Sequence, residues 1–118
     1  MSKGYLTTHV LDTFNGKPGS RIKGSIYILK ETNRKKIKDF VLNEDGRCDG
    51  PILEKDLFNV GKYEIEFNCG EYFRKFTKLN EIPFLDDVVI RFGVNDKNEH
   101  YHVPLLISPW SYTTYKGS

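Results

Sequence analysis

Two of the chain's three histidines lie two residues apart in the stretch HYHVPLL, where His100 and His102 flank Tyr101. The third, His9, lies in the stretch YLTTHVL near the start of the chain. Imidazole titrates near neutral pH, so a histidine can activate water, donate a proton or bind a metal ion. Arg47, in the glycine-containing turn NEDGRCDGP, can hold an anionic or carbonyl group of a substrate through paired N–H donors. These residue types are suited to hydrolysis.

Three kinds of chemistry are compatible with these residues. A metal site needs three or four converging ligands, usually with supporting carboxylates, and no Asp or Glu shares the strand faces of the histidines. Nucleophilic catalysis needs an activated Ser or Cys, and the chain has no G-x-S-x-G motif. Cys48 is a possible nucleophile, but it is more typical of a small buried residue. General acid–base hydrolysis remains, although spacing alone leaves a purely structural role open for each residue.

The composition indicates a soluble globular protein with one domain over residues 1–118. A net charge of +2 is too small to indicate a nucleic-acid partner, and the basic run NRKKIK at 33–38 is typical of a solvated strand edge or loop. No apolar run has the length of a membrane span, and the first residues lack the apolar core of a signal peptide. We therefore expect a cytoplasmic protein with no membrane partner, in which Cys48 and Cys69 are free thiols.

Turn signals divide the chain into segments rich in β-branched and aromatic residues, which predict an all-β sandwich. The expected strands cover residues 5–11, 21–30, 62–69, 87–94, 101–107 and 111–115. One segment differs, because apolar side chains recur at helical spacing over 70–80, and there we expect one short helix.

Side chains alternate between the two faces of a strand. In 100–107 this alternation places one uninterrupted apolar set toward the core, namely Tyr101, Val103, Leu105 and Ile107. The opposite, mixed face holds His100, His102, Pro104 and Leu106, and in 5–11 the outward set is Tyr5, Thr7, His9 and Leu11. Faces that are half apolar predict packing against another subunit, with polar groups in a cleft between subunits. Pro104 cannot donate a ladder hydrogen bond, so we expect a strand edge, or a bulge with an open backbone that a ligand can approach.

Three segments together resemble the 5-hydroxyisourate hydrolases, the transthyretin-related enzymes of urate breakdown. They are LTTHVLDTFNGKPG (6–19), DGRCDGP (45–51) and HYHVPLLISPWSYTTYKGS (100–118). The resemblance implies a transthyretin-like sandwich of two four-stranded sheets with one short helix, assembled as a homotetramer with active sites in a channel between dimers. It also implies hydrolysis of a small purine-derived substrate, 5-hydroxyisourate, to 2-oxo-4-hydroxy-4-carboxy-5-ureidoimidazoline, without metal or organic cofactor.

The resemblance assigns roles to individual residues. The family's catalytic histidine in THVLD falls on His9, the arginine of its GR motif on Arg47, and the second histidine of HYHVP on His102. Its closing tyrosine and serine fall on Tyr115 and Ser118, which we expect to bind substrate.

His100 and Lys116 lie near the predicted site residues in sequence but are not assigned a catalytic role. We expect His100 to be peripheral. The family usually has arginine where this chain has Lys116, and because alternation points Lys116 away from Tyr115 we expect a structural effect there.

The alternative function is a transthyretin-like small-ligand carrier, which would have the same fold and no catalysis.

Overall fold

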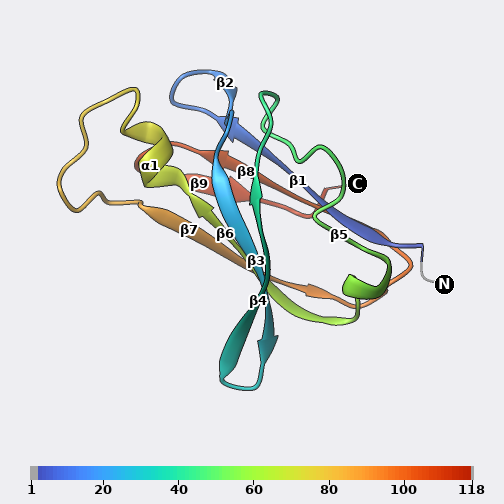
Figure 1. Cartoon of the computed structure of the whole chain (residues 1–118). Helices are drawn as coiled ribbons and strands as arrows, with labels where there is room; N and C mark the ends of the chain where they lie inside the picture. Colours follow the sequence, from blue (N-terminus) through green and yellow to red (C-terminus); the bar gives the residue numbers. More distant parts are fainter. Residues whose placement is uncertain (1–2, 118) are drawn as a thin grey trace.

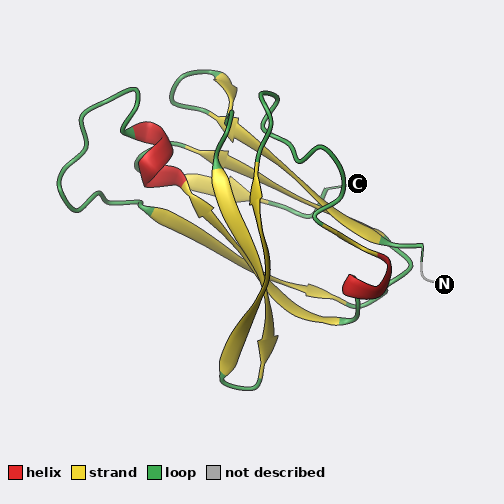
Figure 2. Cartoon of the chain, in the orientation of Figure 1, coloured by secondary structure: helices red, strands yellow, loops and turns green. Residues whose placement is uncertain are grey.

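Two β-sheets face each other, with a short helix at one end of the sandwich, in the computed structural model, which describes residues 3–117 (Figures 1 and 2). The strands are β1 (Tyr5–Asp12), β2 (Lys17–Pro18), β3 (Lys23–Lys30), β4 (Asn33–Val41), β5 (Leu53–Glu54), β6 (Gly61–Asn68), β7 (Asp87–Val94), β8 (His100–Ile107) and β9 (Tyr112–Thr114). The helices are α1 (Cys69–Phe73) and the 3-10 helix η1 (Lys55–Leu57). None of the helices in the described range is long and apolar enough to cross a membrane.

One sheet has the strand order β4-β3-β6-β7 with antiparallel neighbours. The other has the order β2-β1-β8-β9, and β5 also pairs with β1. In this second sheet β1 and β8 run parallel, while the remaining pairs are antiparallel. The predicted all-β sandwich is confirmed. Its second sheet has five strands in the described residues because β2 and β5, each two residues long, extend the edge of β1.

The core lies between the sheets and is built from the faces that alternation predicts. From β1 and β8 the buried side chains are Leu6, Val10, Tyr101, Val103, Leu105 and Ile107. Ile26, Ile65 and Phe67 oppose them from the other sheet. Thr8 is also buried, and its hydroxyl donates a hydrogen bond to the Val103 carbonyl at 2.6 Å, which satisfies the polar group in the core.

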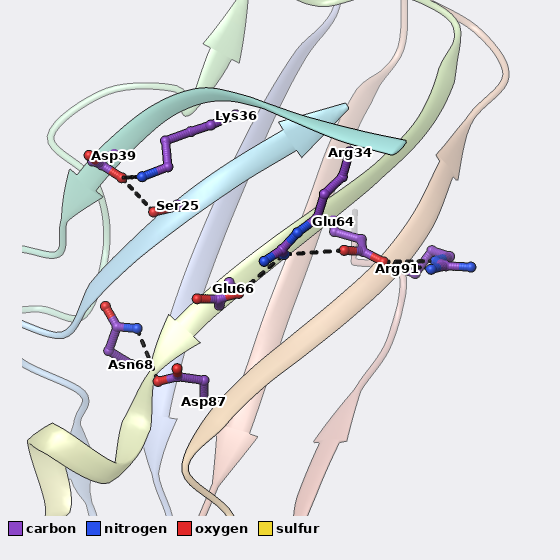
Figure 3. A network of polar contacts seen from close by, with 9 residues as sticks. All are labelled: Ser25, Arg34, Lys36, Asp39, Glu64, Glu66, Asn68, Asp87 and Arg91. Carbon is purple, nitrogen blue, oxygen red and sulfur yellow. Dashed lines mark hydrogen bonds and ion pairs between the residues drawn. The ribbon is translucent and has the colours of Figure 1, made fainter. Parts of the chain in front are cut away.

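The basic run at 33–38 lies on β4, an exposed strand at the edge of its sheet. Of the two predicted alternatives, a strand edge and a loop, the strand edge is the one present. On the outer face of the same sheet, Glu64 is almost fully buried between two arginines (Figure 3). Arg34 contacts both Glu64 (3.4 Å) and Glu66 (3.2 Å), and Arg91 contacts Glu64 at 2.8 Å. Ion pairs therefore connect β4, β6 and β7 across the sheet.

The predicted helix over 70–80 is shorter in the structure, where α1 ends at Phe73. After Phe73 the backbone forms a turn, in which the N–H groups of Phe76 and Thr77 both donate to the Phe73 carbonyl. Tyr72 and Phe73 are buried in the core and Leu79 packs against it, whereas Phe76 is exposed and lies under the Lys17 ammonium group at 4.0 Å. The apolar spacing therefore continues beyond the residue at which the helix ends.

The prediction that Pro104 lies at a strand edge or a bulge is wrong. Strand β8 lies between β1 and β9, and its register with β1 is unbroken. Because Pro104 has no N–H to donate toward β9, the β8–β9 ladder ends at Leu105↔Thr114 and continues only as the single bridge His102↔Gly117. The predicted local opening of the backbone is present, but it lies in the interior of the sheet.

A buried carboxylate fixes the turn that follows β1. Asp12 is 1% exposed and accepts hydrogen bonds from the backbone N–H groups of Phe14 and Asn15, both at 2.9 Å. It also accepts from the Asn15 side-chain amide and from the Tyr72 hydroxyl, both at 2.7 Å. Burial, together with the Asp12 carboxylate, raises the pKa of Tyr72, so the donating hydroxyl stays neutral. Helix α1 is thereby tied to the end of β1.

Replacing Tyr72 by Phe removes the hydroxyl that donates to the buried Asp12 carboxylate. We expect the free energy of unfolding to fall by about 1.5–3 kcal/mol, the range for a hydrogen bond to a charged group. Urea unfolding at one fixed protein concentration measures the change. Tyr63→Phe is the matched control, since its hydroxyl donates to the uncharged Asn59 carbonyl at 2.7 Å and its loss costs about 0.5–1.5 kcal/mol. A larger loss for Tyr63→Phe than for Tyr72→Phe would contradict the role given to Asp12.

Candidate active site

Three of the predicted site residues meet on the outer face of the sheet that contains β1 and β8. His9 lies on β1 and His102 on the adjacent β8, where the parallel register pairs His102 with Thr7. His9 and His102 are therefore two residues apart in register and share one face. Arg47 lies on the opposite side of β1 from β8 and forms an isolated bridge with His9. Segments from the beginning, middle and end of the chain thus converge.

The segment that carries Arg47 runs along the free edge of β1. The N–H of Val10 donates to the Gly46 carbonyl at 2.9 Å, and the N–H of Ile52 donates to the Leu6 carbonyl at 2.7 Å. The chain between these two contacts therefore follows β1, and β5 continues the pairing. Strands β2 and β5 pair with the two ends of β1 and leave the middle of its edge free. This segment covers that middle part and brings Arg47 next to His9.

The turn before Arg47 depends on Asn43 and Gly46. The Asn43 side-chain oxygen accepts from the backbone N–H groups of Asp45 (2.9 Å) and Arg47 (3.1 Å). Gly46 has φ +75°, and a Cβ there would lie 2.5 Å from the Val10 carbonyl oxygen. Glycine is required both by this left-handed conformation and by the close approach to β1. Gly46 therefore allows the turn to approach β1 closely enough to position the side chain of Arg47, the next residue.

Burial and the electrostatic environment favour the neutral form of both histidines. Burial and the positive charge of Arg47 lower the pKa of His9 below the ordinary value of 6.5, and Asp45 opposes this shift. Burial, Arg47, His100 and His9 lower the pKa of His102 in the same direction. Since Arg47 acts on both rings, the three groups share one electrostatic site. A neutral imidazole has a lone pair that can accept a proton from water.

Thr7 is a site residue that sequence reasoning missed. Its Oγ1 lies 2.8 Å from His102 Nδ1 and 2.7 Å from His100 Nε2. Alternation already placed Thr7 on the outward face, but only the register between β1 and β8 reveals that it stands between the two imidazoles. His100, expected to be peripheral, is hydrogen-bonded to Thr7 and stacks on Tyr5 with ring centroids 4.1 Å apart. It is thus connected to His102 through one hydroxyl.

A cavity of about 210 Å³ lies beside β1 and includes Thr7 and Arg47 in its lining. Cys48 also lines it, but burial raises the pKa of this thiol, which disfavours the thiolate that a nucleophile requires. Within residues 3–117, no three His, Cys, Asp or Glu side chains are grouped as ligands of one metal ion. Of the three predicted catalytic residues, Arg47 lines this cavity, whereas His9 and His102 are not among its lining residues.

The end of the chain returns to His102. The Gly117 N–H donates to the His102 carbonyl at 2.8 Å, and a Cβ on Gly117 would lie 2.6 Å from Cδ2 of the His102 ring. Glycine therefore lets the terminal segment pass against the imidazole. Ser118, the other predicted substrate-binding residue at this end, lies outside the described residues.

Tyr115 follows β9 directly, and its side chain is exposed. It lines a second cavity, of about 230 Å³, together with Tyr101 and Val103, and not the cavity that contains Arg47. Lys116 lines this same cavity, so its predicted orientation away from Tyr115 is not confirmed. It pairs with Glu99 at 2.6 Å, and its ammonium group lies 4.9 Å from the centroid of the Tyr101 ring.

Comparison with known proteins extends the likeness over nearly the whole chain. A protein of Pseudomonas aeruginosa named 5-hydroxyisourate hydrolase is 49% identical over 116 residues, which cover 98% of this chain and 92% of that protein. The crystal structure of an (S)-allantoin synthase matches with a TM-score of 0.92 and 46% identity over 99% of this chain, which spans only 44% of that solved chain. A solved 5-hydroxyisourate hydrolase of Klebsiella pneumoniae has a TM-score of 0.78 and 27% identity, with both chains fully covered.

Residues 6–117 also match the model of the HIUase/Transthyretin family. This match includes all the residues that converge on β1 and β8, and the two-sheet sandwich is shared with the solved relatives. The chain therefore belongs to the HIUase/Transthyretin family.

Proposed function

We propose that this chain hydrolyses 5-hydroxyisourate to 2-oxo-4-hydroxy-4-carboxy-5-ureidoimidazoline. The observation that carries the proposal is the convergence of His9, His102 and Arg47 on one sheet face, where burial and the guanidinium charge lower the pKa of both imidazoles. Relatives named for this activity support it, among them the P. aeruginosa protein at 49% identity. Family membership alone does not decide, because the family is named for both the hydrolase and transthyretin.

The proposed mechanism is general acid–base hydrolysis. One imidazole of the pair His9 and His102 accepts a proton from water as the water oxygen bonds to the substrate carbonyl carbon. The negative charge that develops on the carbonyl oxygen is stabilised by the N–H donors of Arg47. When the C–N bond breaks and opens the ring, the proton taken from water is delivered to the leaving nitrogen, and the other imidazole assists this transfer. In this scheme no metal or organic cofactor takes part.

The remaining parts of the proposal concern assembly and the end of the chain. We propose that the single domain over 1–118 forms a cytoplasmic homotetramer in which the outer face of β1 and β8 packs against another subunit. Leu11 is 36% exposed on this face and Leu106 is half-buried, which is more apolar than bare surface requires. Tyr115 and Ser118 would contact substrate in the assembled channel, where residues of different subunits come together.

A small-ligand carrier is the alternative with the same fold. A carrier has no need of two neutral imidazoles beside a guanidinium group, so the electrostatics of His9, His102 and Arg47 favour catalysis. The activity test uses 5-hydroxyisourate made from urate with urate oxidase, and follows its decay by absorbance. Decay at the spontaneous rate in the presence of the protein would refute the proposed hydrolase.

Replacing either histidine by asparagine removes a group that transfers a proton. We expect His9→Asn and His102→Asn each to lower kcat by about 10²–10⁴-fold, the usual contribution of a general acid or base. Size-exclusion chromatography should show the same assembly as the unchanged protein. Near-normal turnover in both variants would exclude the acid–base scheme.

The pH dependence of kcat/KM tests the electrostatic role of Arg47. Because the catalytic base must be neutral and its pKa is lowered, the acid limb of the profile should lie below pH 6.5. Arg47→Gln removes the positive charge, so the pKa of His9 and His102 should rise and the acid limb should move to higher pH. Arg47→Lys retains the charge and should leave the limb in place, even if substrate binding weakens. An unmoved limb in Arg47→Gln would show that this charge does not set the histidine pKa values.

Gly117→Ala tests the close contact between the terminal segment and the His102 ring. A methyl group at this position displaces the imidazole, and a displacement of about 1 Å can lower the rate by about 10²-fold. We expect kcat to fall toward that limit while the melting temperature changes little. Gly93→Ala is the control, since nothing lies within 4 Å of a Cβ at that position. Equal activities of the two variants would contradict the steric role of Gly117.

A further inference from the structure

A continuous row of side chains crosses from β1 to β8 beside the site. The parallel register pairs Tyr5 with His100 and Thr7 with His102, so four outward side chains form two adjacent rows. Thr7 Oγ1 stands between the two imidazoles, 2.7 Å from His100 Nε2 and 2.8 Å from His102 Nδ1. Both distances are those of hydrogen bonds. The hydroxyl therefore connects the predicted catalytic histidine to a second histidine that the proposed mechanism does not use.

A hydroxyl group has one proton, and this limits the states of the row. Thr7 can donate to one imidazole nitrogen only, so when both rings are neutral the other facing nitrogen must donate to Thr7. In the first state Thr7 donates to His102 Nδ1, the His102 proton lies on Nε2, and His100 Nε2–H donates to Thr7. In the second state His102 Nδ1–H donates to Thr7, Thr7 donates to His100 Nε2, and His102 Nε2 has a free lone pair. The tautomers of the two histidines are thereby coupled.

We propose that Thr7 is a positioning residue that sets the tautomer of His102, and that His100 completes a proton relay through its hydroxyl. This inference rests on the proposed function. In the second state His102 Nε2 faces the site with its lone pair and takes a proton from the attacking water or the substrate. The proton on Nδ1 then passes to Thr7 Oγ1, and the original hydroxyl proton passes to His100 Nε2. His102 ends neutral with its proton on Nε2, and the positive charge ends on His100.

The surroundings favour this direction of transfer. Arg47 and His9 act against a positive charge on His102, so moving the charge to the outer ring relieves that repulsion. His100 stacks on the Tyr5 ring with centroids 4.1 Å apart and an angle of 13° between the planes. Tyr5 therefore holds the His100 ring in place.

The Thr7 hydroxyl has no evident structural task that would explain it otherwise. The neighbouring Thr8 points inward, and its hydroxyl ties β1 to the Val103 carbonyl at 2.6 Å. Both hydrogen bonds of the Thr7 side chain go to imidazole nitrogens. A valine would have the same shape and an equally good strand propensity at this position. The hydroxyl is therefore the chemically distinctive part of the residue.

Three variants separate the hydroxyl from the shape of the side chain. Thr7→Val keeps the shape and removes the hydroxyl, and Thr7→Ser keeps the hydroxyl. Thr13→Val is the control, because Thr13 also donates its hydroxyl to β8, to the Ile107 carbonyl at 3.1 Å, but lies beyond the site. Each protein is assayed for 5-hydroxyisourate hydrolysis, and the protonated nitrogen of each histidine ring is identified by two-bond ¹⁵N–¹H correlation spectra without substrate.

We expect Thr7→Val to lower kcat by about 10–100-fold, part of what a general acid–base group supplies, with KM nearly unchanged. Its His102 spectrum should change tautomer or become a mixture, while Thr7→Ser and Thr13→Val retain the activity and the spectrum of the unchanged protein. His100→Phe retains the stacking on Tyr5 but cannot accept the proton, and it should lower kcat in the same range.

Unchanged kcat and His102 tautomer in Thr7→Val would overturn the proposal, as would equal losses in Thr7→Val and Thr7→Ser. Wild-type kcat in His100→Phe would overturn the relay. Failure of the proposed function is distinguishable, because the unchanged protein would then not accelerate the decay of 5-hydroxyisourate, whereas the tautomer spectra would still report the coupling through Thr7.

Discussion

The parallel pairing of β1 with β8 is the constraint on which the rest of the site depends. It joins two strands more than 90 residues apart in sequence, with an unbroken register from Tyr5↔His100 to Asp12↔Ile107. The same register places the buried side chains of both strands in the core and their polar side chains on the opposite face. A shift of one residue in either strand would turn that strand's polar set into the core. Core packing therefore also fixes the relative positions of His9, Thr7 and His102.

Arg47 has two effects that follow from one placement. In the proposed mechanism its guanidinium group holds substrate oxygens, and its charge adds to burial in lowering the pKa of the two histidines. The placement depends on Gly46, whose left-handed backbone brings the turn against the Val10 carbonyl. The histidine pKa values and the proposed substrate binding by Arg47 thus both depend on the left-handed backbone of Gly46.

Local pattern was sufficient to predict six of the strands and the faces of β1 and β8, because alternation depends only on the pleat of each strand. It did not predict β4 as a strand, since the basic run was assigned to a strand edge or a loop, and it missed the two-residue strands β2 and β5. The neighbours of each strand could not be predicted in this way, since pairing depends on packing between distant segments. The interior position of Pro104 and the role of Thr7 both follow from such pairing. The helix over 70–80 was predicted too long, because the apolar spacing continues beyond the residue at which the helix ends. Arg47 was already a candidate from its turn, whereas the assignment of Tyr115 came from the family resemblance, and the geometry joins Arg47, but not Tyr115, to the histidines within one chain.

The distance in sequence between β1 and β8 has a consequence for the biosynthesis of the protein. A domain folds as a unit during synthesis, and contacts between distant segments must await the later one. While the ribosome makes the intervening strands, β1 has no partner on the side where β8 will lie, and its apolar residues, such as Leu6 and Val10, lack half of their cover. The incomplete chain therefore exposes a strand edge that other chains can bind. It also lacks His102, so the pair of His9 and His102 does not yet exist. Activity and protection from aggregation arise together, when β8 emerges and closes the sheet.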